Sequence, residues 1–389
     1  RITAQLIDTE TNSHLWSDTY DRRLENVFDI QSEIAEELRL PLGLEEGESL
    51  VTPTGDLDAY DLYLAGRAQM RSRGLDGITQ AIELLEAAVA RDSNWAPAWA
   101  GLAESRALFP FYADGNNASP DSAVWRRSLE GAEQAALHAL DLDPRNASAR
   151  VALANVYRDR WEWDAAEREY LRAIELDVDN VEAHQQYAEM LFYAGRPADA
   201  VMEAARALSL DRSPIRLNVM GWSLWLNGRR EEARVIYEEA ILKDPEHRVH
   251  FVPNSLAQIE LLEGRYREAI DRFGPVLWDS ISYRLSGEAL ESGDPSSLLE
   301  YIGPPDDPRP AIVWPSVWIR LGMADRSIDV MKTLIQRQPY GGLGALWDPE
   351  PQGSPIYEHP RFRQEILPMV NLEGHVVRTL PPEVEIPGI

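Results

Sequence analysis

The sequence predicts an all-α solenoid of about eight stacked helix-turn-helix units, with a small partial α/β segment at its N-terminus. The first observation is a repeat. Alanines recur at spacings close to 34 residues, at Ala132, Ala166, Ala200, Ala233 and Ala269. The second is that all but the last have another alanine seven residues later, and the third is that each unit carries two amphipathic helical stripes. A single helix pair cannot bury its apolar face alone, so we expect the pairs to stack in a line.

The first 48 residues differ in pattern from the rest of the chain. Apolar and polar residues alternate from Ile2 to Leu6, Asp8 to Ser13 is rich in turn-forming residues, and Leu15 to Tyr20 is strand-like again. This pattern predicts a β-hairpin. A helix is predicted by the apolar residues that follow at steps of three and four: Val27, Ile30, Ile34 and Leu38.

Residues 49–56 lack periodicity and are assigned to a linker, and residues 57–339 are assigned to the repeat array. The pattern is looser at the edges of the array. Tyr60 to Asp92 fits a first unit with a longer turn, and the second unit carries an insertion around Phe109 to Asp121 that we expect to be a loop. Residues 340–389 are expected to form a C-terminal tail.

The repeat resembles the tetratricopeptide repeat, a two-helix unit of about 34 residues with small residues at fixed positions. The segments that carry the resemblance are AWAGLAESR at 98–106, ALHALDLDPRNASA at 136–149 and AIELDVDNVEAHQQYAEMLFYAGRPADA at 173–200. Gly195 and Gly228 stand at the turn between the two helices of a unit. The resemblance implies a right-handed superhelix whose inner wall is built by the first helix of each unit.

Two further segments resemble bacterial proteins in which a TolB-like α/β domain precedes such an array. RITAQLIDTETNSHLWSDTYDRRLENVFDIQSEIAEEL at 1–38 resembles the end of that domain, so residues 1–48 are assigned to its remnant, and SPIYEHPRFRQEI at 354–366 resembles the tail of those proteins. The resemblance implies an upstream winged-helix DNA-binding domain or a nucleotide-cyclase domain. Because the chain opens on Arg1, we expect further sequence to precede it. The chain is therefore interpreted as the sensor or scaffold half of a larger regulator.

The composition is that of ordinary folded protein with a strongly negative surface, because 38 basic residues face 65 acidic ones and leave a net charge of −27. Such a surface repels phosphate backbones and anionic headgroups, so we expect no direct nucleic-acid binding and neutral or basic protein partners. No apolar run is long enough for a membrane span, and the absence of cysteine excludes disulfides and cysteine-ligated metals. The expected compartment is the cytoplasm, or the periplasm if a membrane span precedes the chain.

No motif predicts a catalytic residue, a cofactor or a metal site, so we expect no enzyme activity from these residues. The HxxH pair of His247 and His250 lacks a nearby carboxylate motif, and the glycine run at 341–344 lacks the Lys-Ser/Thr of a phosphate loop. Adjacent acidic residues such as Glu231 and Glu232 do not face each other on a helix, which makes them solvated surface.

The expected function is therefore binding of a peptide or helix of a partner protein in the concave groove. Carboxamides can donate to and accept from a peptide backbone, while aromatic rings supply contact area. The groove residues are predicted from the helix face opposite the packing stripe: Asn155, Arg158, Gln185, Glu189, Phe192, Tyr193, Asn218, Trp222, Trp225, Asn254 and Gln258.

Burial of an unpaired amide costs about 1 to 3 kcal/mol, so the three asparagines of this set are expected to face solvent or ligand. For Trp222 and Trp225, packing in the core between units fits the pattern as well as exposure in the groove does. Arg158 is the only cation of the set and Glu189 opposes it, so capture of a peptide's C-terminal carboxylate is not predicted.

Two alternatives stay open. In the first, the chain is the regulatory region of a nucleotide cyclase whose catalytic domain lies upstream. In the second, the solenoid is an assembly factor that self-associates through its tryptophan-rich end at Trp314 and Trp318.

Overall fold

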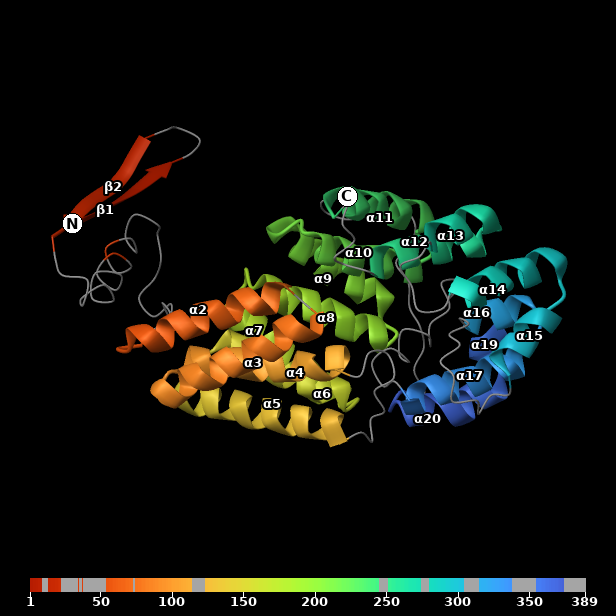
Figure 1. Cartoon of the computed structure of the whole chain (residues 1–389), viewed down its shortest axis with the longest axis horizontal. Helices are drawn as coiled ribbons and strands as arrows, with labels where there is room; N and C mark the ends of the chain where they lie inside the picture. Colours follow the sequence, from red (N-terminus) through yellow and green to blue (C-terminus); the bar gives the residue numbers. More distant parts are fainter. Residues whose placement is uncertain are drawn as a thin grey trace.

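The described residues form an N-terminal hairpin and a row of paired helices that curves through the rest of the chain (Figure 1). In this computed structural model they are residues 1–8, 13–21, 54–72, 74–113, 123–244, 251–273, 280–303, 315–337 and 355–373, with Ile34 and Glu37. The fold class is the predicted all-α solenoid.

The predicted hairpin is present: β1 (Ile2–Asp8) pairs with β2 (Ser13–Tyr20) antiparallel, and the register shifts between Leu6 and Ile7. Tyr20 is the buried residue of β2, and its hydroxyl donates to Glu37 Oε2 at 3.0 Å. Apart from Ile34 and Glu37, the helix predicted around 27–38 lies outside the described residues, and so does most of the predicted linker.

Eight helix pairs follow within the described ranges, as the repeat predicts. In chain order they are α2 (Leu57–Ser72) with α3 (Gly74–Arg91), α4 (Ala96–Ala113) with α5 (Ala123–Leu142), α6 (Ala147–Asp159) with α7 (Trp163–Leu176), α8 (Val181–Tyr193) with α9 (Pro197–Leu210), α10 (Pro214–Leu226) with α11 (Arg230–Lys243), α12 (Phe251–Leu262) with α13 (Tyr266–Phe273), α14 (Ser280–Ser292) with α15 (Ser296–Ile302), and α16 (Pro315–Arg320) with α17 (Ala324–Arg337). One expectation is corrected: α4 runs through Pro110 to Ala113, so the start of the predicted insertion is helical and not a loop.

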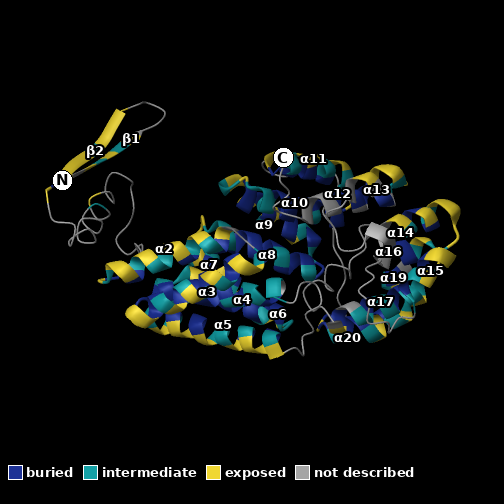
Figure 2. Cartoon of the chain, viewed as in Figure 1, coloured by how far each residue is buried: buried dark blue, intermediate teal, exposed yellow. Residues whose placement is uncertain are grey.

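Small residues let the two helices of a pair approach closely. The repeating alanines are buried at the crossings, as Figure 2 shows for the interior of the array: Ala132, Ala166, Ala200, Ala233 and Ala269. The tightest approach is at Gly221 of α10, where a Cβ atom would lie 2.5 Å from the ring of Tyr237 on α11. Tyr237 is itself fully buried, so its ring has little room to move away.

The turn between the two helices of a pair uses a left-handed backbone. Gly195, Gly228 and Gly264 hold this position with φ of 69°, 75° and 80°. Trp161 stands at the same place between α6 and α7 with φ of 60°. Only glycine adopts this conformation without steric cost, so the tryptophan is a strained exception to the repeat.

Successive first helices contact one another along the array, from α4 to α6, α8, α10 and α12. We call the side of these helices that is turned away from the second helices α5, α7, α9 and α11 the inner wall; on α8 and α10 its residues are buried or half-buried. Together with the 34-residue period and the buried alanines, this arrangement is that of a tetratricopeptide-like array.

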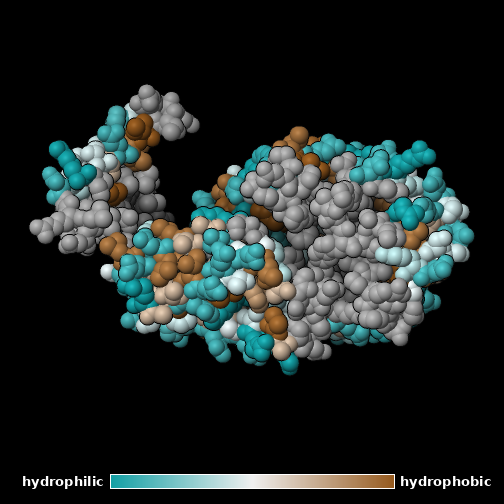
Figure 3. Space-filling model, viewed as in Figure 1, coloured by the Kyte–Doolittle hydropathy of each residue, from teal (hydrophilic) through white to brown (hydrophobic). Residues whose placement is uncertain are grey.

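The two ends of the array differ. Leu57, Leu64 and Leu75 of the first pair stay exposed, and Figure 3 shows apolar surface gathered over α2 and α3. At the other end Trp318 is fully buried against Leu298 and its neighbours within the chain. The Trp318 indole fills the intramolecular core, so it offers no surface for the self-association that was left open as an alternative; Trp314 lies outside the described residues.

The C-terminal tail is part of the core. It contains α19 (Pro355–Glu358), the π-helix η4 (Phe362–Ile366) and α20 (Leu367–Met369), and the turn after it reaches Leu372. Phe362, Ile366 and Val370 are buried in one apolar cluster with residues of α6 and α8. Among the helices that the structure describes, none has the length and apolar character needed to cross a bilayer.

His184 of α8 is buried with both ring nitrogens engaged. Its Nδ1 lies 2.7 Å from Glu203 Oε2 on α9, and its Nε2 lies 3.0 Å from the Val178 carbonyl oxygen. Burial lowers the pKa of His184, and so does the nearby Arg206, but the hydrogen bonds to Glu203 and Val178 outweigh both and hold the pKa above its usual value. The imidazolium is the form that satisfies both acceptors.

The Gly221→Ala substitution is expected to destabilise the chain by about 1 to 3 kcal/mol, because the new methyl group overlaps the buried Tyr237 ring. The matched control is Gly131→Ala in the interior of α5, where the Cβ atom would meet only the flexible end of Arg106 at 3.3 Å. Urea unfolding of both variants measures the difference. Equal stabilities would show that the α10–α11 crossing is looser than described.

His184→Gln is expected to cost more stability at pH 6 than at pH 9. A raised folded-state pKa gives stability that is complete below the unfolded value of about 6.5 and is lost as pH rises through the folded value. The free energy of unfolding, measured against pH for wild type and variant, gives their difference directly. Glu203→Gln should flatten the pH dependence of the free energy of unfolding in the same way. A difference between wild type and His184→Gln that stays constant from pH 6 to pH 9 would contradict the raised pKa of His184.

Candidate functional site

The candidate site is the inner wall formed by α6, α8 and α10. Successive turns of these helices place the predicted groove residues side by side, because each helix contacts the next. The side chains of Asn254 and Gln258, on α12, lie outside the described residues, so their placement in the groove stays a prediction.

A polar network joins α6 to α8 on this wall. The guanidinium of Arg158 donates from Nε to Asp159 Oδ1 at 3.0 Å and from Nη1 to Gln186 Oε1 at 2.8 Å, and it lies 3.7 Å from Glu189 Oε2. Gln185 Nε2 donates to Glu189 Oε1 at 3.0 Å. The structure thus brings together the predicted residues Arg158, Gln185 and Glu189.

Arg158 is the one cation of this network and lies between two carboxylates, those of Asp159 and Glu189. Arg158 and Asp159 are both buried. Burial raises the pKa of Asp159, and the adjacent Arg158 opposes that rise. Because Arg158 is already held by carboxylates, it is not a receptor for the carboxylate of a ligand, which agrees with the prediction from sequence.

An aromatic cluster continues the wall from α8 to α10. The ring centroids of Phe192 and Tyr193 lie 4.9 Å apart, those of Phe192 and Trp222 5.7 Å, and those of Trp222 and Trp225 4.8 Å. Trp222 and Tyr193 are half-buried, whereas Phe192 and Trp225 are buried. Trp225 therefore fills the core between pairs, while Trp222 keeps part of its surface on the wall.

Asn155 requires a correction. It is 3% exposed, and its Oδ1 accepts a hydrogen bond from the hydroxyl of Tyr170 on α7. The expectation that Asn155 faces solvent or ligand is wrong, because the paired helix supplies a buried partner that removes the cost of burial.

Three polar atoms of the predicted groove residues are buried without a hydrogen-bond partner. They are Gln185 Oε1, Asn218 Oδ1 and Trp225 Nε1. Asn218 is 8% exposed, so the expectation that it faces solvent is also wrong, but its carbonyl oxygen is left unsatisfied. Unpaired buried atoms also occur elsewhere in the described residues, such as Trp161 Nε1 and Trp318 Nε1, so what distinguishes those of α8 and α10 is the aromatic cluster beside them.

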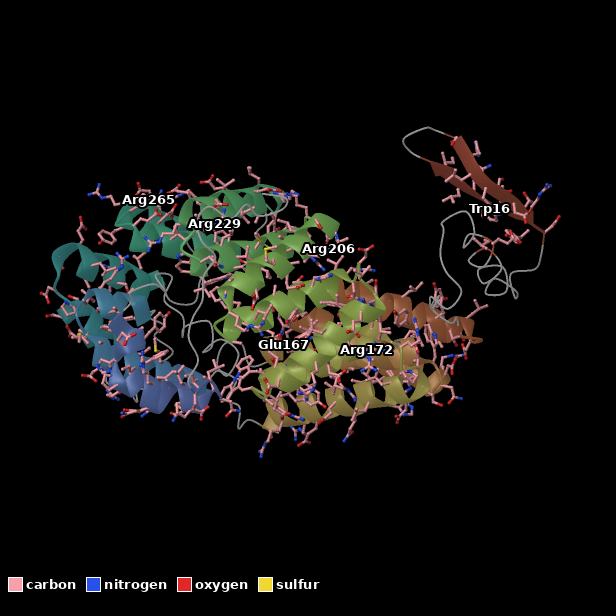
Figure 4. All side chains as sticks on the ribbon, turned by 180° about the vertical axis from the view of Figure 1, so that it is seen from behind. Trp16, Glu167, Arg172, Arg206, Arg229 and Arg265 are labelled. Atoms are coloured by element: carbon pink, nitrogen blue, oxygen red, sulfur yellow. The ribbon has the colours of Figure 1, made fainter. Side chains whose placement is uncertain are left out.

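Some residues of the wall were not predicted. Asp159 and Gln186 hold Arg158 in place, although each is only one position away from a predicted groove residue. On the outer side, Tyr187 and Arg196 both donate to Glu167, at 2.6 and 2.7 Å; Figure 4 labels Glu167. Helix periodicity would have included Gln186 if the predicted polar face of α8 had been one residue wider.

Chemical groups suited to catalysis are not gathered at this wall. Within the described ranges, no group of three or more His, Asp or Glu residues is placed to hold a metal ion. A partly open cavity of about 290 Å³ lies between α5 and the α6–α7 turn, lined by Trp125, Leu129, Asp159 and Trp161 among others. His247, His250 and the glycine run at 341–344 lie outside the described residues.

Comparisons with known proteins give one similar sequence and several similar structures. No protein-family model matches the chain. The chain is 31% identical over 160 residues to "Putative adenylate cyclase 3" of Rhizobium meliloti (strain 1021); the match covers 40% of the chain and 26% of that protein. The chain thus corresponds to about a quarter of the length of that relative.

The similar structures include TTC0263, a thermophilic TPR protein of Thermus thermophilus, with 15% identity, coverage of 51% of this chain and 98% of that one, and a TM-score of 0.42. Yeast Tom70 matches with 16% identity, coverage of 88% and 74%, and a TM-score of 0.44. The human IFIT1 dimer with PPP-AAAA matches with 18% identity, coverage of 79% and 69%, and a TM-score of 0.47.

Proposed function

We propose that the chain is a non-catalytic interaction scaffold whose inner wall binds a peptide or helix of a partner protein. The observation that carries this proposal is the set of unpaired polar atoms beside the aromatic cluster of α8 and α10. All three atoms are buried, so a peptide reaches them only when the helices around them move apart. Gln185 Oε1 and Asn218 Oδ1 would then accept from two N–H groups, and Trp225 Nε1 would donate to a carbonyl oxygen.

The aromatic residues supply the apolar part of such a site. Trp222 and Phe192 stand edge to face, and Trp222 keeps exposed surface beside Asn218 on the same helix. An aromatic anchor next to hydrogen-bonding groups is typical of the residues that dominate binding energy at protein interfaces.

The net charge of −27 favours partners with basic segments, because the field of the chain attracts them and repels acidic ones. We place the chain in the scaffold or sensor half of a larger bacterial regulator, in the cytoplasm, and residues 1–48 in the end of a TolB-like domain. The hairpin of β1 and β2 is compatible with that assignment.

A second candidate function is the regulatory region of a nucleotide cyclase. The observation that favours it is the 31% identity with the Rhizobium protein described as an adenylate cyclase, of which the chain matches 26%. Under this proposal the array transmits partner binding to a catalytic domain elsewhere in the whole protein.

Selection from a displayed library of random peptides is expected to yield ligands that lose more than about tenfold in affinity on Trp222→Ala. Asn218→Ala should weaken the same peptides, whereas Met202→Ala, at an exposed position of the outer helix α9, should not. Titration calorimetry measures the affinities, and circular dichroism checks that each variant is folded. Peptides that bind all three variants equally well would reject the inner wall as the site.

Basic peptides from the same selection should associate more slowly as sodium chloride is raised from about 0.05 to 0.5 M, because salt screens the field of the chain. Stopped-flow fluorescence measures the association rate. A neutral peptide of the same set serves as control, and equal salt dependence of both would remove electrostatic steering.

Incubation of the chain with ATP and Mg²⁺ or Mn²⁺ is expected to give no cyclic AMP above the level of buffer alone. Chromatographic detection of cyclic AMP formation that scales with protein concentration would refute the non-catalytic assignment.

A further inference from the structure

Two residues other than glycine have a left-handed backbone within the described ranges, and the structure joins them. They are Trp161, with φ of 60°, and Asn371, with φ of 55°. Asn371 Nδ2 donates to the Trp161 carbonyl oxygen at 3.2 Å, across 210 residues of sequence. Asparagine tolerates this conformation, but tryptophan does not, so contacts from elsewhere must hold the α6–α7 turn in place.

The neighbouring residue of the tail makes a second hydrogen bond to the same turn. Trp163 Nε1 donates to the Val370 carbonyl oxygen at 2.7 Å. Consecutive residues of the C-terminal tail, Val370 and Asn371, are thus bound by Trp163 and Trp161. The turn that departs from the glycine pattern of the repeat is the one that receives the tail.

Apolar packing extends these contacts. Trp161 and Trp163 pack against a cluster in which Ile366, Leu367 and Val370 of the tail are buried. The same cluster contains Phe192 of the inner wall. The tail and part of the inner wall therefore share one core.

Ion pairs fix the other end of the tail to the last helix pair. Arg361 donates to Asp325 at 2.8 Å and to Asp329 at 2.7 Å, both on α17, and Lys332 of α17 lies 2.6 Å from Glu365. The segment 355–373 is thus attached to α17 by charges and to the third pair by apolar contacts and two hydrogen bonds. It connects the eighth pair to the third and closes the curve of the array.

The inner wall next to this shared core is incompletely satisfied in its hydrogen bonds. Gln185, Asn218 and Trp225 are all more than nine-tenths buried, and each keeps an unpaired polar atom. Burial without a partner costs free energy at each of these atoms, and a peptide backbone at the wall would supply the missing bonds once the helices around them had moved apart. Because Phe192 of the wall and the tail share one core, release of the tail would loosen that side of the wall.

We propose that residues 355–373 form an intramolecular latch, which docks on the Trp161–Trp163 turn, holds the array closed over its inner wall and opens it when it undocks. Docking of the latch needs no ligand, whereas its control of peptide binding rests on the proposed function. A peptide can bind only to the fraction of molecules in which the latch has undocked. The latch therefore lowers the apparent affinity of the chain for the peptide in proportion to that fraction.

The full chain has no cysteine, so pairs of spin labels can be placed without background. Labels at Asp164→Cys and Glu373→Cys, both exposed, report the distance between the turn and the tail. Labels at Arg172→Cys and Arg206→Cys, on α7 and α9 (Figure 4), report whether the array itself stays folded. The latch is opened by Leu367→Asp with Val370→Asp, which puts charges into the buried contact, and Arg363→Ala on the exposed side of the tail is the matched control.

Double electron–electron resonance is expected to give a narrow, short Asp164–Glu373 distance in the otherwise wild-type chain and in the control. The aspartate variant should give a broad, longer distribution while the Arg172–Arg206 distance stays unchanged. A broad distribution in the otherwise wild-type chain, or a narrow one in the aspartate variant, would overturn the latch.

Titration with a fluorescein-labelled peptide from the library selection tests the regulatory part. The aspartate variant is expected to bind about tenfold more tightly than wild type, through loss of the competing closed state. Equal affinities in a variant whose latch is open would overturn control by the latch. Failure of both chains to bind any peptide would reject the proposed function and with it the regulatory part, while the distance measurement would still decide whether the tail closes the array.

Discussion

The structure depends on the close approach of two helices at one small residue in each pair. At Gly221 the contact with Tyr237 leaves no room even for a methyl group, and at Ala166 and Ala200 the alanine side chain is fully buried. Because the crossing recurs every 34 residues or so, each pair takes up the same orientation to the next. The continuous inner wall is a consequence of that repeated contact, since it requires every first helix to lie on the same side of the array.

The inner wall combines satisfied and unsatisfied polar groups. On α6, Arg158 and Asn155 find partners in neighbouring helices. On α8 and α10 the carbonyl oxygens of Gln185 and Asn218 do not, and they lie beside an aromatic cluster. Natural proteins tolerate such local conflicts where a function requires them, which is why the wall between α8 and α10 is the part to which we assign binding.

Trp161 is a second local conflict, and it has a different origin. The repeat uses glycine at this turn in later pairs, yet here a tryptophan is held in the same backbone conformation by contacts with the tail. The strain at one turn and the docking of a segment 210 residues away are therefore two aspects of one contact. The contact joins the eighth helix pair to the third, so that, in our proposal, access to the wall depends on a segment far along the chain.

The sequence by itself determined the helix pairs, their number and the buried alanines, because helical periodicity and small-residue spacing are local properties that stacking repeats without change. Only the tertiary structure decided which of the candidate binding residues are exposed: Asn155 is satisfied by Tyr170 of the paired helix, Trp225 fills the core, and Trp318 is enclosed by its own chain. Burial at these positions depends on side chains from other helices and on a tail far along the sequence, and no periodic pattern in a single helix contains that information.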